Sequence, residues 1–326
     1  MPKPSPMDSE FFSAKFDEMQ KKKPTPARLF HYTTQAGLIG IVDSGSIWAT
    51  KIQYLNDSSE FDLSIFTNRI DKYISDVEKV SSDNFELDVL RLARVNTIGI
   101  ANANICVTSF CTDGDLLSQW RGYTGGGAGY SIGFQTTELL QKIDIFGCKL
   151  RRCIYDEADQ VAIIDEVISK ALQAAGDLTG EAQEIGNRRA VLGIAEQLEK
   201  AILTYSACFK HSRFSEEDEW RLVSIPVSYT DDNFKFRVGL STINPYYVMN
   251  IVGKNNEDGK VVNGPWYRII DRVIVGPCPH PRLSRESIVG MMIKYRVSDP
   301  GDAGRHDYAD LLRSRVIDST IPFRHW

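Results

Sequence analysis

The chain has 326 residues, 42% of them hydrophobic, which is enough to build a sizeable core in one large domain or two small ones. Its formal net charge of −5, with acidic and basic residues interspersed, gives no broad positive field, so binding of bulk nucleic acid would need a local basic patch. The sequence shows neither a secretory signal nor an apolar run of about 18 residues, and we expect a cytoplasmic protein with no membrane partner.

The first part of the chain predicts a short helix and then a strand–helix–strand unit. Residues 5–22 begin with Ser-Pro, carry aromatic residues on one face and end at KKKPTP, which indicates a docking helix and linker over 1–27. The next expected elements are a strand from Leu29, a helix over about 35–44 that Gly45 ends, and a strand over 46–52.

The middle of the chain mixes helices with β-rich runs. The expected elements are helices at 56–80 and 84–96, strands at 104–111, 129–134 and 149–155, and a glycine-containing loop at 112–128. The stretch 156–210 is rich in Ala, Glu and Leu and has almost no β signal. We interpret it as an all-helical insertion into a sheet domain.

The last third is dominated by strands. The expected elements are strands at 219–225, 234–241, 246–252, 268–277 and 314–319 and a helix at 284–295. Because the strands come in blocks and do not alternate with helices, the pattern predicts the α+β class, with a single α+β domain over 28–326.

The cysteines give no sign of a metal site or of a disulfide framework. They are dispersed and lack the CxxC and His-Cys spacings typical of zinc ligands. We therefore expect reduced, buried packing residues and no metal at the six positions Cys106, Cys111, Cys148, Cys153, Cys208 and Cys278.

The first expected strand carries a pair of polar side chains on one face. Alternation places His31 and Thr33 on that face and Tyr32 on the other, with Phe30. One interpretation is that His31 caps a backbone group at the mouth of the core. The other is that the pair lines a cleft, since the strand–helix–Gly–strand unit presents both residues together.

The segment NDSSE opens the expected long helix. Asp57 is a plausible N-cap, and Glu60, three residues on, completes a capping box. Alternatively, a helix N-terminus beside a cleft offers amide donors to an anion, with Asn56 close by.

The loop at 112–128 contains aromatic residues, Arg121 and a run of glycines. It lacks the GK[ST] ending of a phosphate-binding loop and precedes a strand, so it fits neither that loop nor the dinucleotide fingerprint. One interpretation is a flap whose Trp120 or Tyr123 stacks on a planar ring. The other is a turn tethered by a buried Trp120.

The segment FSEEDEWRLV places two carboxylates and a guanidinium on one side of a strand. Glu217, Glu219 and Arg221 alternate with Asp218 and Trp220. The structural interpretation is an ion pair on a solvated strand edge. The catalytic interpretation is that a carboxylate stabilises an oxocarbenium-like sugar cation and holds a ribose hydroxyl.

Taken together, several motifs resemble the bacterial family called domain of unknown function 2971. The motifs are LFHYTT, SGSIWAT, LNDSSE, LLSQWRGY, GAGYSIGF, FKHSRFSEEDEWRLV, VIVGP and DSTIPFR, and they cover most of the chain from about 29 to 324. This resemblance implies a family and no activity.

The opening LFHYTTQAGLIGIVDSGSIWAT also resembles the start of ADP-ribosyltransferases, above all the toxin branch that modifies DNA. That resemblance implies packed mixed or antiparallel sheets and an NAD site in which His31 and Thr33 bind the adenosine side. It also implies that Glu219 is the catalytic glutamate of a late strand, with Glu217 as its partner toward the acceptor.

The same resemblance implies further contacts with NAD. Trp120 or Tyr123 would stack on nicotinamide, with Tyr130 as a third possibility, and Arg121 would bind the pyrophosphate. The complete expected set of NAD-binding residues is His31, Tyr32, Thr33, Asn56, Ser109, Trp120, Arg121, Tyr123 and Arg221.

We therefore expect an enzyme that uses NAD as a co-substrate, breaks the nicotinamide–ribose bond and transfers ADP-ribose to an acceptor. The acceptor is open among protein, DNA, RNA and small molecules, and plain NAD hydrolysis is a close variant. A role as a toxin or phage-defence effector is a hypothesis from the looser resemblance. The competing expectation is a non-catalytic nucleotide-binding or interaction module whose partner surface is the helical stretch 156–210.

Overall fold

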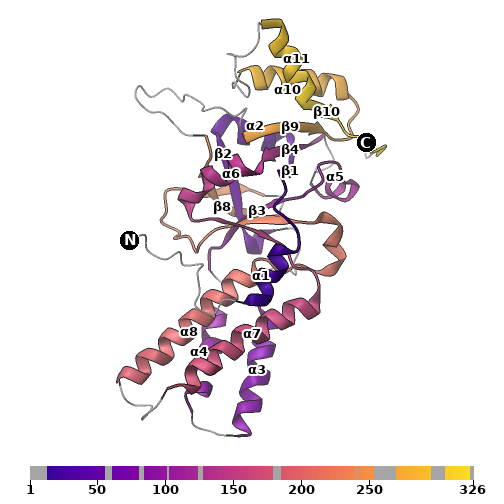
Figure 1. Ribbon diagram of the computed structural model, residues 1–326. Coiled ribbons are helices and arrows are strands. Elements are labelled where there is room, and N and C mark those ends of the chain that lie inside the picture. The colour runs from indigo at the N-terminus through magenta and orange to yellow at the C-terminus, as the bar shows by residue number, and fades with distance from the viewer. Residues whose placement is uncertain are drawn as a thin grey trace.

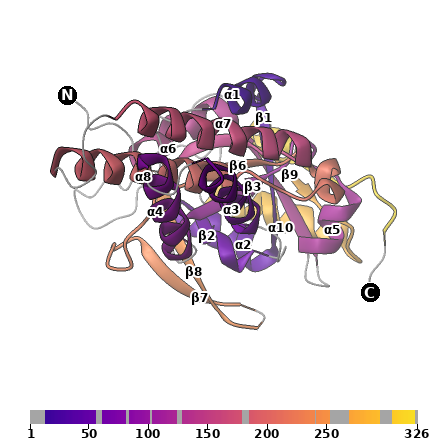
Figure 2. The same cartoon turned by 90° about the horizontal axis from the view of Figure 1, so that it is seen from below.

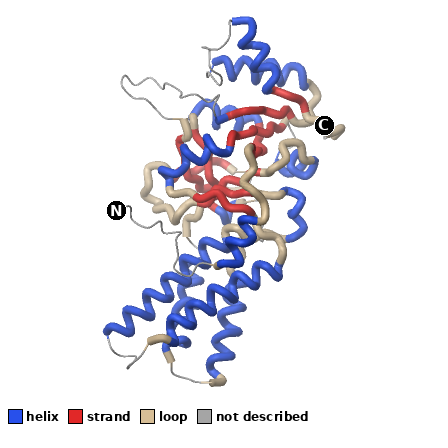
Figure 3. The backbone as a smooth tube through the Cα atoms, in the orientation of Figure 1, coloured by secondary structure: helices blue, strands red, loops and turns tan. Residues whose placement is uncertain are grey.

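Two β-sheets lie in the middle of the molecule, between a helical bundle at one end and a helical pair at the other (Figures 1 and 3). The computed structural model describes residues 13–55, 61–80, 84–100, 103–123, 128–178, 185–239, 241–252, 269–294 and 305–323. The expected α+β class is confirmed, with one mixed and one antiparallel sheet.

The smaller sheet has the strand order β1-β4-β9-β10. Its strands are β1 (Arg28–Thr34), β4 (Gly129–Gln135), β9 (Ile270–Val275) and β10 (Val316–Asp318). The first three are mutually antiparallel, and β10 runs parallel to β9. The helices α10 (Pro281–Lys294) and α11 (Arg305–Arg315) lie beside the smaller sheet and form the helical pair at that end of the molecule (Figure 1).

The larger sheet is antiparallel and has the strand order β5-β6-β3-β2-β8-β7. Its strands are β2 (Ser46–Lys51), β3 (Cys106–Phe110), β5 (Lys149–Arg152), β6 (Trp220–Val223), β7 (Phe234–Val238) and β8 (Ile243–Asn250). An isolated bridge between Phe30 and Cys111 connects the sheets through two backbone hydrogen bonds of 2.9 and 2.8 Å. The end of β3 therefore meets the start of β1.

The unit that follows β1 forms as expected. Helix α2 (Gln35–Ser44) begins after Thr34, whose side chain accepts a hydrogen bond from the Gly37 amide. It ends at Gly45, which adopts the left-handed conformation with φ of 68°. The chain then reverses directly into β2.

A bundle of helices covers one end of the larger sheet (Figures 1 and 2). Its members are α3 (Ser64–Glu78), α4 (Phe85–Ile100), α7 (Glu157–Gly176) and α8 (Ile185–Ser206). The stretch expected to be helical at 156–210 thus contains α7 and α8. Helix α1 (Ala14–Lys21) contacts α7 because the Ser13 hydroxyl donates to Glu166 at 2.7 Å.

Shorter helices connect these parts, and the core falls into two main clusters. The shorter elements are α5 (Leu117–Tyr123), α6 (Thr136–Ile143) and the 3₁₀ turns Ile52–Tyr54, Asp144–Phe146 and Ser212–Glu217.

Of the two main hydrophobic clusters, one lies between the sheets, and the other fills the bundle and includes Val107 and Val223 of the larger sheet. The bundle therefore packs onto that sheet and shares its hydrophobic core.

Two further expectations concern the cysteines and the membrane. The six cysteines are free thiols, five of them buried and Cys278 half-buried, as expected for packing residues. Within the described residues, no helix has the length and apolar character needed to cross a membrane.

Candidate functional site

His31 lies where β1 meets the end of β3. Its Nδ1 is 2.9 Å from the backbone carbonyl oxygen of Ser109. A carbonyl only accepts, so Nδ1 carries the proton and Nε2 retains its lone pair. The ring is half-buried, as is Ser109. His31 therefore caps a backbone group, as one interpretation predicts, and still offers an acceptor atom.

The surroundings of His31 favour its neutral form. Burial lowers the pKa of the imidazole, and the nearby Arg237 guanidinium lowers it further, while the hydrogen bond to Ser109 offsets only part of the effect. The imidazole is thus uncharged near pH 7, and its Nε2 is suited to accept a hydrogen bond from a hydroxyl.

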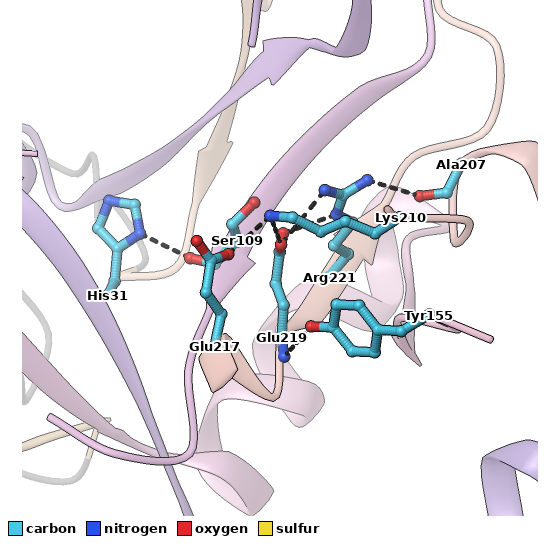
Figure 4. Close-up of polar contacts among 8 residues, drawn as sticks. All are labelled: His31, Ser109, Tyr155, Ala207, Lys210, Glu217, Glu219 and Arg221. Carbon is cyan, nitrogen blue, oxygen red and sulfur yellow. Dashed lines mark hydrogen bonds and ion pairs between the residues drawn. The ribbon is translucent and has the colours of Figure 1, made fainter. Parts of the chain in front are cut away.

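Beside this position lies a buried group of four charged side chains, here called the ion cluster: Lys210, Glu217, Glu219 and Arg221 (Figure 4). The Lys210 ammonium contacts Glu219 and donates to Glu217 at 2.7 Å. Arg221 donates through Nε to Glu219 at 2.6 Å and through Nη1 to the Ala207 carbonyl at 3.0 Å. Two positive and two negative charges balance within the cluster.

The cations hold Glu219 in its ionised form. Burial alone would raise the pKa of this carboxyl, but Arg221 and Lys210 outweigh burial and hold that pKa at about 2. The backbone amide of Glu219 also donates to the Tyr155 hydroxyl at 2.8 Å. The carboxylate is thus a fixed anion that positions both cations.

A strained residue aims both glutamates at Lys210. Asp218 has φ of 39°, an unfavourable value for a residue with a side chain. Its carboxylate holds this kink through Lys23 at 3.0 Å, Thr112 at 3.1 Å and Arg152 at 3.2 Å. Glu217 and Glu219, on either side, therefore contact the same ammonium.

The strand register brings the ion cluster next to His31. Ser109 lies opposite Arg221 in the β3–β6 pair, and the Ser109 carbonyl accepts a hydrogen bond from Nδ1 of His31. In the view of Figure 4 the Glu217 carboxylate lies between the imidazole and the Lys210 ammonium. Both glutamates also raise the pKa of Cys111, after the larger effect of burial, which agrees with their position at this crossing.

A row of polar and aromatic side chains continues along the same face of the larger sheet. Thr50 lies opposite Tyr246, and Arg237 of β7 donates to the Thr50 hydroxyl at 2.9 Å across the Tyr246 ring. Trp48, half-buried, packs against Tyr246 with ring centroids 5.1 Å apart. Trp48, Thr50 and Arg237 occupy alternating positions of SIWAT and FKFRV, and sequence reasoning did not identify them as site residues.

Several expected contacts are corrected because their side chains are buried. Arg221 is 0% exposed and Glu219 1% exposed, and their charges pair with each other, so neither reaches a ligand. The ion pair of the structural interpretation exists, but it is buried and does not lie on a solvated edge. Glu217, with an 11% exposed side chain, is the more accessible carboxylate.

Tyr32 and Trp120 are likewise packing residues. Their rings contact edge to face at 4.8 Å, and Trp120 is 1% exposed, which leaves no face of the indole for nicotinamide. The Tyr32 hydroxyl donates to the Asp113 carbonyl at 3.0 Å and accepts from the Leu116 amide at 2.8 Å. Trp120 is therefore buried, as the alternative interpretation predicts, but the expected loop is wrong here because Trp120 lies in helix α5.

Asp115 fixes this loop to the C-terminal segment, and sequence reasoning missed it. Its carboxylate accepts from the Trp120 indole at 2.8 Å and from the Thr320 amide at 2.7 Å and also contacts Ser319. The motifs SQWRGY and DSTIPF are thus joined by one carboxylate.

The other expected residues lie in different places. Thr33 is half-exposed beside α2, Tyr123 is half-buried against the Trp120 cluster, and Arg121 is exposed with its guanidinium 5.2 Å from the Phe323 ring centre. Buried Tyr130 belongs to the core between the sheets. Asn56 and the rest of NDSSE lie outside the described residues.

The site as a whole offers one neutral imidazole, one partly accessible carboxylate and one half-buried guanidinium, His31, Glu217 and Arg237, beside two aromatic rings. Among the described residues, no group of three His, Cys, Asp or Glu side chains is arranged to hold a metal ion. The arrangement suits a ligand with hydroxyl groups, a planar ring and a negative charge.

In comparisons with known proteins, one segment of the chain matches a protein family. Residues 119–222 match the family model described as Protein of unknown function (DUF2971). This segment runs from α5 to β6 and includes all four members of the ion cluster. No curated protein and no solved structure matches the chain.

Proposed function

We propose that the chain, of which residues 119–222 match the DUF2971 family model, is an ADP-ribosyltransferase-like enzyme that binds NAD and breaks its nicotinamide–ribose bond. The observation that carries this proposal is the position of His31: its imidazole binds the Ser109 carbonyl, and Ser109 lies opposite Arg221 of the ion cluster in the β3–β6 pair. The two packed sheets and the strand–helix–Gly45 unit after His31 support a fold of this kind.

In this proposal the half-buried polar groups bind the adenosine side of NAD. Nε2 of neutral His31 accepts a hydrogen bond from a ribose hydroxyl, and the half-buried Ser109 hydroxyl extends the polar surface. Trp48 replaces Trp120 as the aromatic residue available for ring stacking, because Trp48 is half-buried and Trp120 is sealed.

Glu217 provides the anion for the bond-breaking step. The glycosidic electron pair leaves with nicotinamide, and positive charge develops on the ribose ring, where a carboxylate stabilises it. The acceptor then forms a bond to the anomeric carbon and loses a proton; when water is the acceptor, the reaction is hydrolysis. Glu219 and Arg221 act as positioning residues, since Arg221 holds Glu219, and Glu219 holds Lys210 and through it Glu217.

The test is the release of nicotinamide from labelled NAD, with separate protein, DNA and RNA pools as acceptors. Glu217→Gln is expected to lower turnover about 10²- to 10⁴-fold, the range typical of a catalytic electrostatic or proton-transfer group. Glu216→Gln is the matched control, because Glu216 is exposed and adjacent in sequence. Equal turnover in the two variants would refute the role of Glu217.

The second candidate is a module that binds the nucleotide and does no chemistry. It is favoured by the charge balance inside the ion cluster, which is complete without a ligand. This candidate predicts that NAD raises the melting temperature while no nicotinamide is released and no pool is labelled. Release of nicotinamide that depends on Glu217 would exclude it.

A further inference from the structure

Arg237 is a half-buried cation on the outermost strand of the larger sheet, β7 (Figure 2). Its guanidinium reaches inward over Tyr246, 5.6 Å from the ring centre, and donates to the Thr50 hydroxyl at 2.9 Å. Burial lowers the pKa of this group, and the effect of Tyr246 offsets only part of the shift. The protein therefore keeps this charge in an unfavourable environment.

Arg237 differs in its partners from four other buried or half-buried arginines. Arg28, Arg69, Arg152 and Arg221 each form an ion pair with a carboxylate. For Arg237, the described part of the chain provides a hydroxyl and an aromatic ring and no carboxylate. A desolvated guanidinium without an anion is costly, and an anionic ligand would offset this cost.

The position of Arg237 links it to the site described above. Thr50 and Tyr246 are directly opposite in the β2–β8 pair, and Trp48 packs on Tyr246. The Arg237 charge also acts on the His31 imidazole. A ligand that contacts His31 and extends along this face of the sheet therefore reaches Arg237.

We propose that Arg237 and the Thr50 hydroxyl form a subsite for the diphosphate group of the nucleotide. The inference rests on the proposed function, of which it names the anion-binding part. The planar guanidinium presents several N–H donors to phosphate oxygens, and the Thr50 hydroxyl, which accepts from Arg237, has its own proton to donate. Arg121, the residue expected from the sequence, lies instead against Phe323.

The test compares the binding of ADP and adenosine by calorimetry to the full-length protein. For the wild type we expect ADP to bind about 10- to 100-fold more tightly than adenosine, the effect of a charge-assisted hydrogen bond. Arg237→Ala should remove this preference and leave adenosine affinity unchanged. Arg237→Lys should restore only part of it, because the planar fork is lost.

Arg282→Ala serves as the matched control, since Arg282 is exposed on α10. Circular dichroism of each variant verifies folding. A wild type that binds ADP no better than adenosine, or that binds neither, would overturn the subsite, as would a preference that survives in Arg237→Ala. NAD cleavage is measured separately: an Arg237-dependent ADP preference without cleavage retains the subsite and removes the proposed reaction.

Discussion

At the scale of single residues, the ion cluster makes the clearest claim about stability. Glu219→Gln removes a buried charge and leaves Lys210 and Arg221 undercompensated, so we expect a loss of about 3 kcal/mol in the free energy of unfolding. Urea unfolding at pH 7 measures it. The control Glu216→Gln changes an exposed glutamate of the same segment and should change the free energy of unfolding by less than about 0.5 kcal/mol. Equal losses would contradict the account.

The same carboxylate predicts an acid dependence. Its pKa is about 2 in the folded protein, against about 4.3 for an ordinary glutamate in the unfolded chain. The unfolded state thus binds more protons between these values, and the stability from Glu219 is complete above about pH 5 and is lost as pH falls toward 2. Unfolding curves from pH 6 to 3 should show a smaller decline for Glu219→Gln than for wild type.

Residue-level reasoning from the sequence succeeded where alternation decides the face of a strand. It placed Glu217, Glu219 and Arg221 on one side of a strand, and the structure joins all three in the ion cluster through Lys210 and the Glu219–Arg221 pair. It did not identify Lys210, because a lysine after a helix has no distinctive pattern. It also did not identify Arg237, because only the three-dimensional structure shows that its partners among the described residues are a hydroxyl and a ring. It misassigned Trp120 as a ligand-stacking ring, since aromatic residues of loops and of cores look alike in sequence.

At the scale of elements, Asp115 is the contact that joins α5 to the chain after β10. Asp115→Ala removes acceptors for the Trp120 indole and for the amide of Thr320. We expect a loss of about 1–3 kcal/mol, the cost of unsatisfied polar groups, and faster amide hydrogen exchange at Thr320. Exchange measured by NMR tests this; unchanged protection at Thr320 would show that the contact does not hold the segment.

Elements with strong periodicity or clear end signals were predictable. The helix over 35–44 and its Gly45 end match α2, and the β-rich runs match β3 and β4. Helix α5 was missed because its sequence, LSQWRGY, is short and lies beside a run of glycines. Helix α11 was missed because RHDYADLLRSR is dominated by charged residues and has little apolar pattern.

At the scale of the whole molecule, the bundle and the larger sheet share one hydrophobic cluster through Val107 and Val223. We therefore expect them to unfold together. Thermal unfolding followed by far-ultraviolet circular dichroism, which reports mainly helices, should coincide with the change in tryptophan fluorescence, to which Trp48, Trp120 and Trp220 of the sheet region contribute. Two separate midpoints would mean that the bundle is an independent unit.

The strand order could not be predicted from the sequence. β6 pairs with β3 although α7 and α8 lie between them in the chain. β1 likewise pairs with β4 although β2 and β3 of the larger sheet lie between them in the chain. Such pairings depend on packing between distant segments, which local pattern does not encode. The crossing at Phe30 and Cys111, which creates the candidate site, is a product of this order.

The central claim is that His31 and Glu217 act on one ligand, and nicotinamide release from NAD by the purified protein tests it most directly. The account predicts measurable release by the wild type, a decrease of at least about 10²-fold in Glu217→Gln and a clear decrease in His31→Ala, with Glu216→Gln unaffected. Release that is absent from the wild type, or that persists unchanged in both site variants, would contradict it.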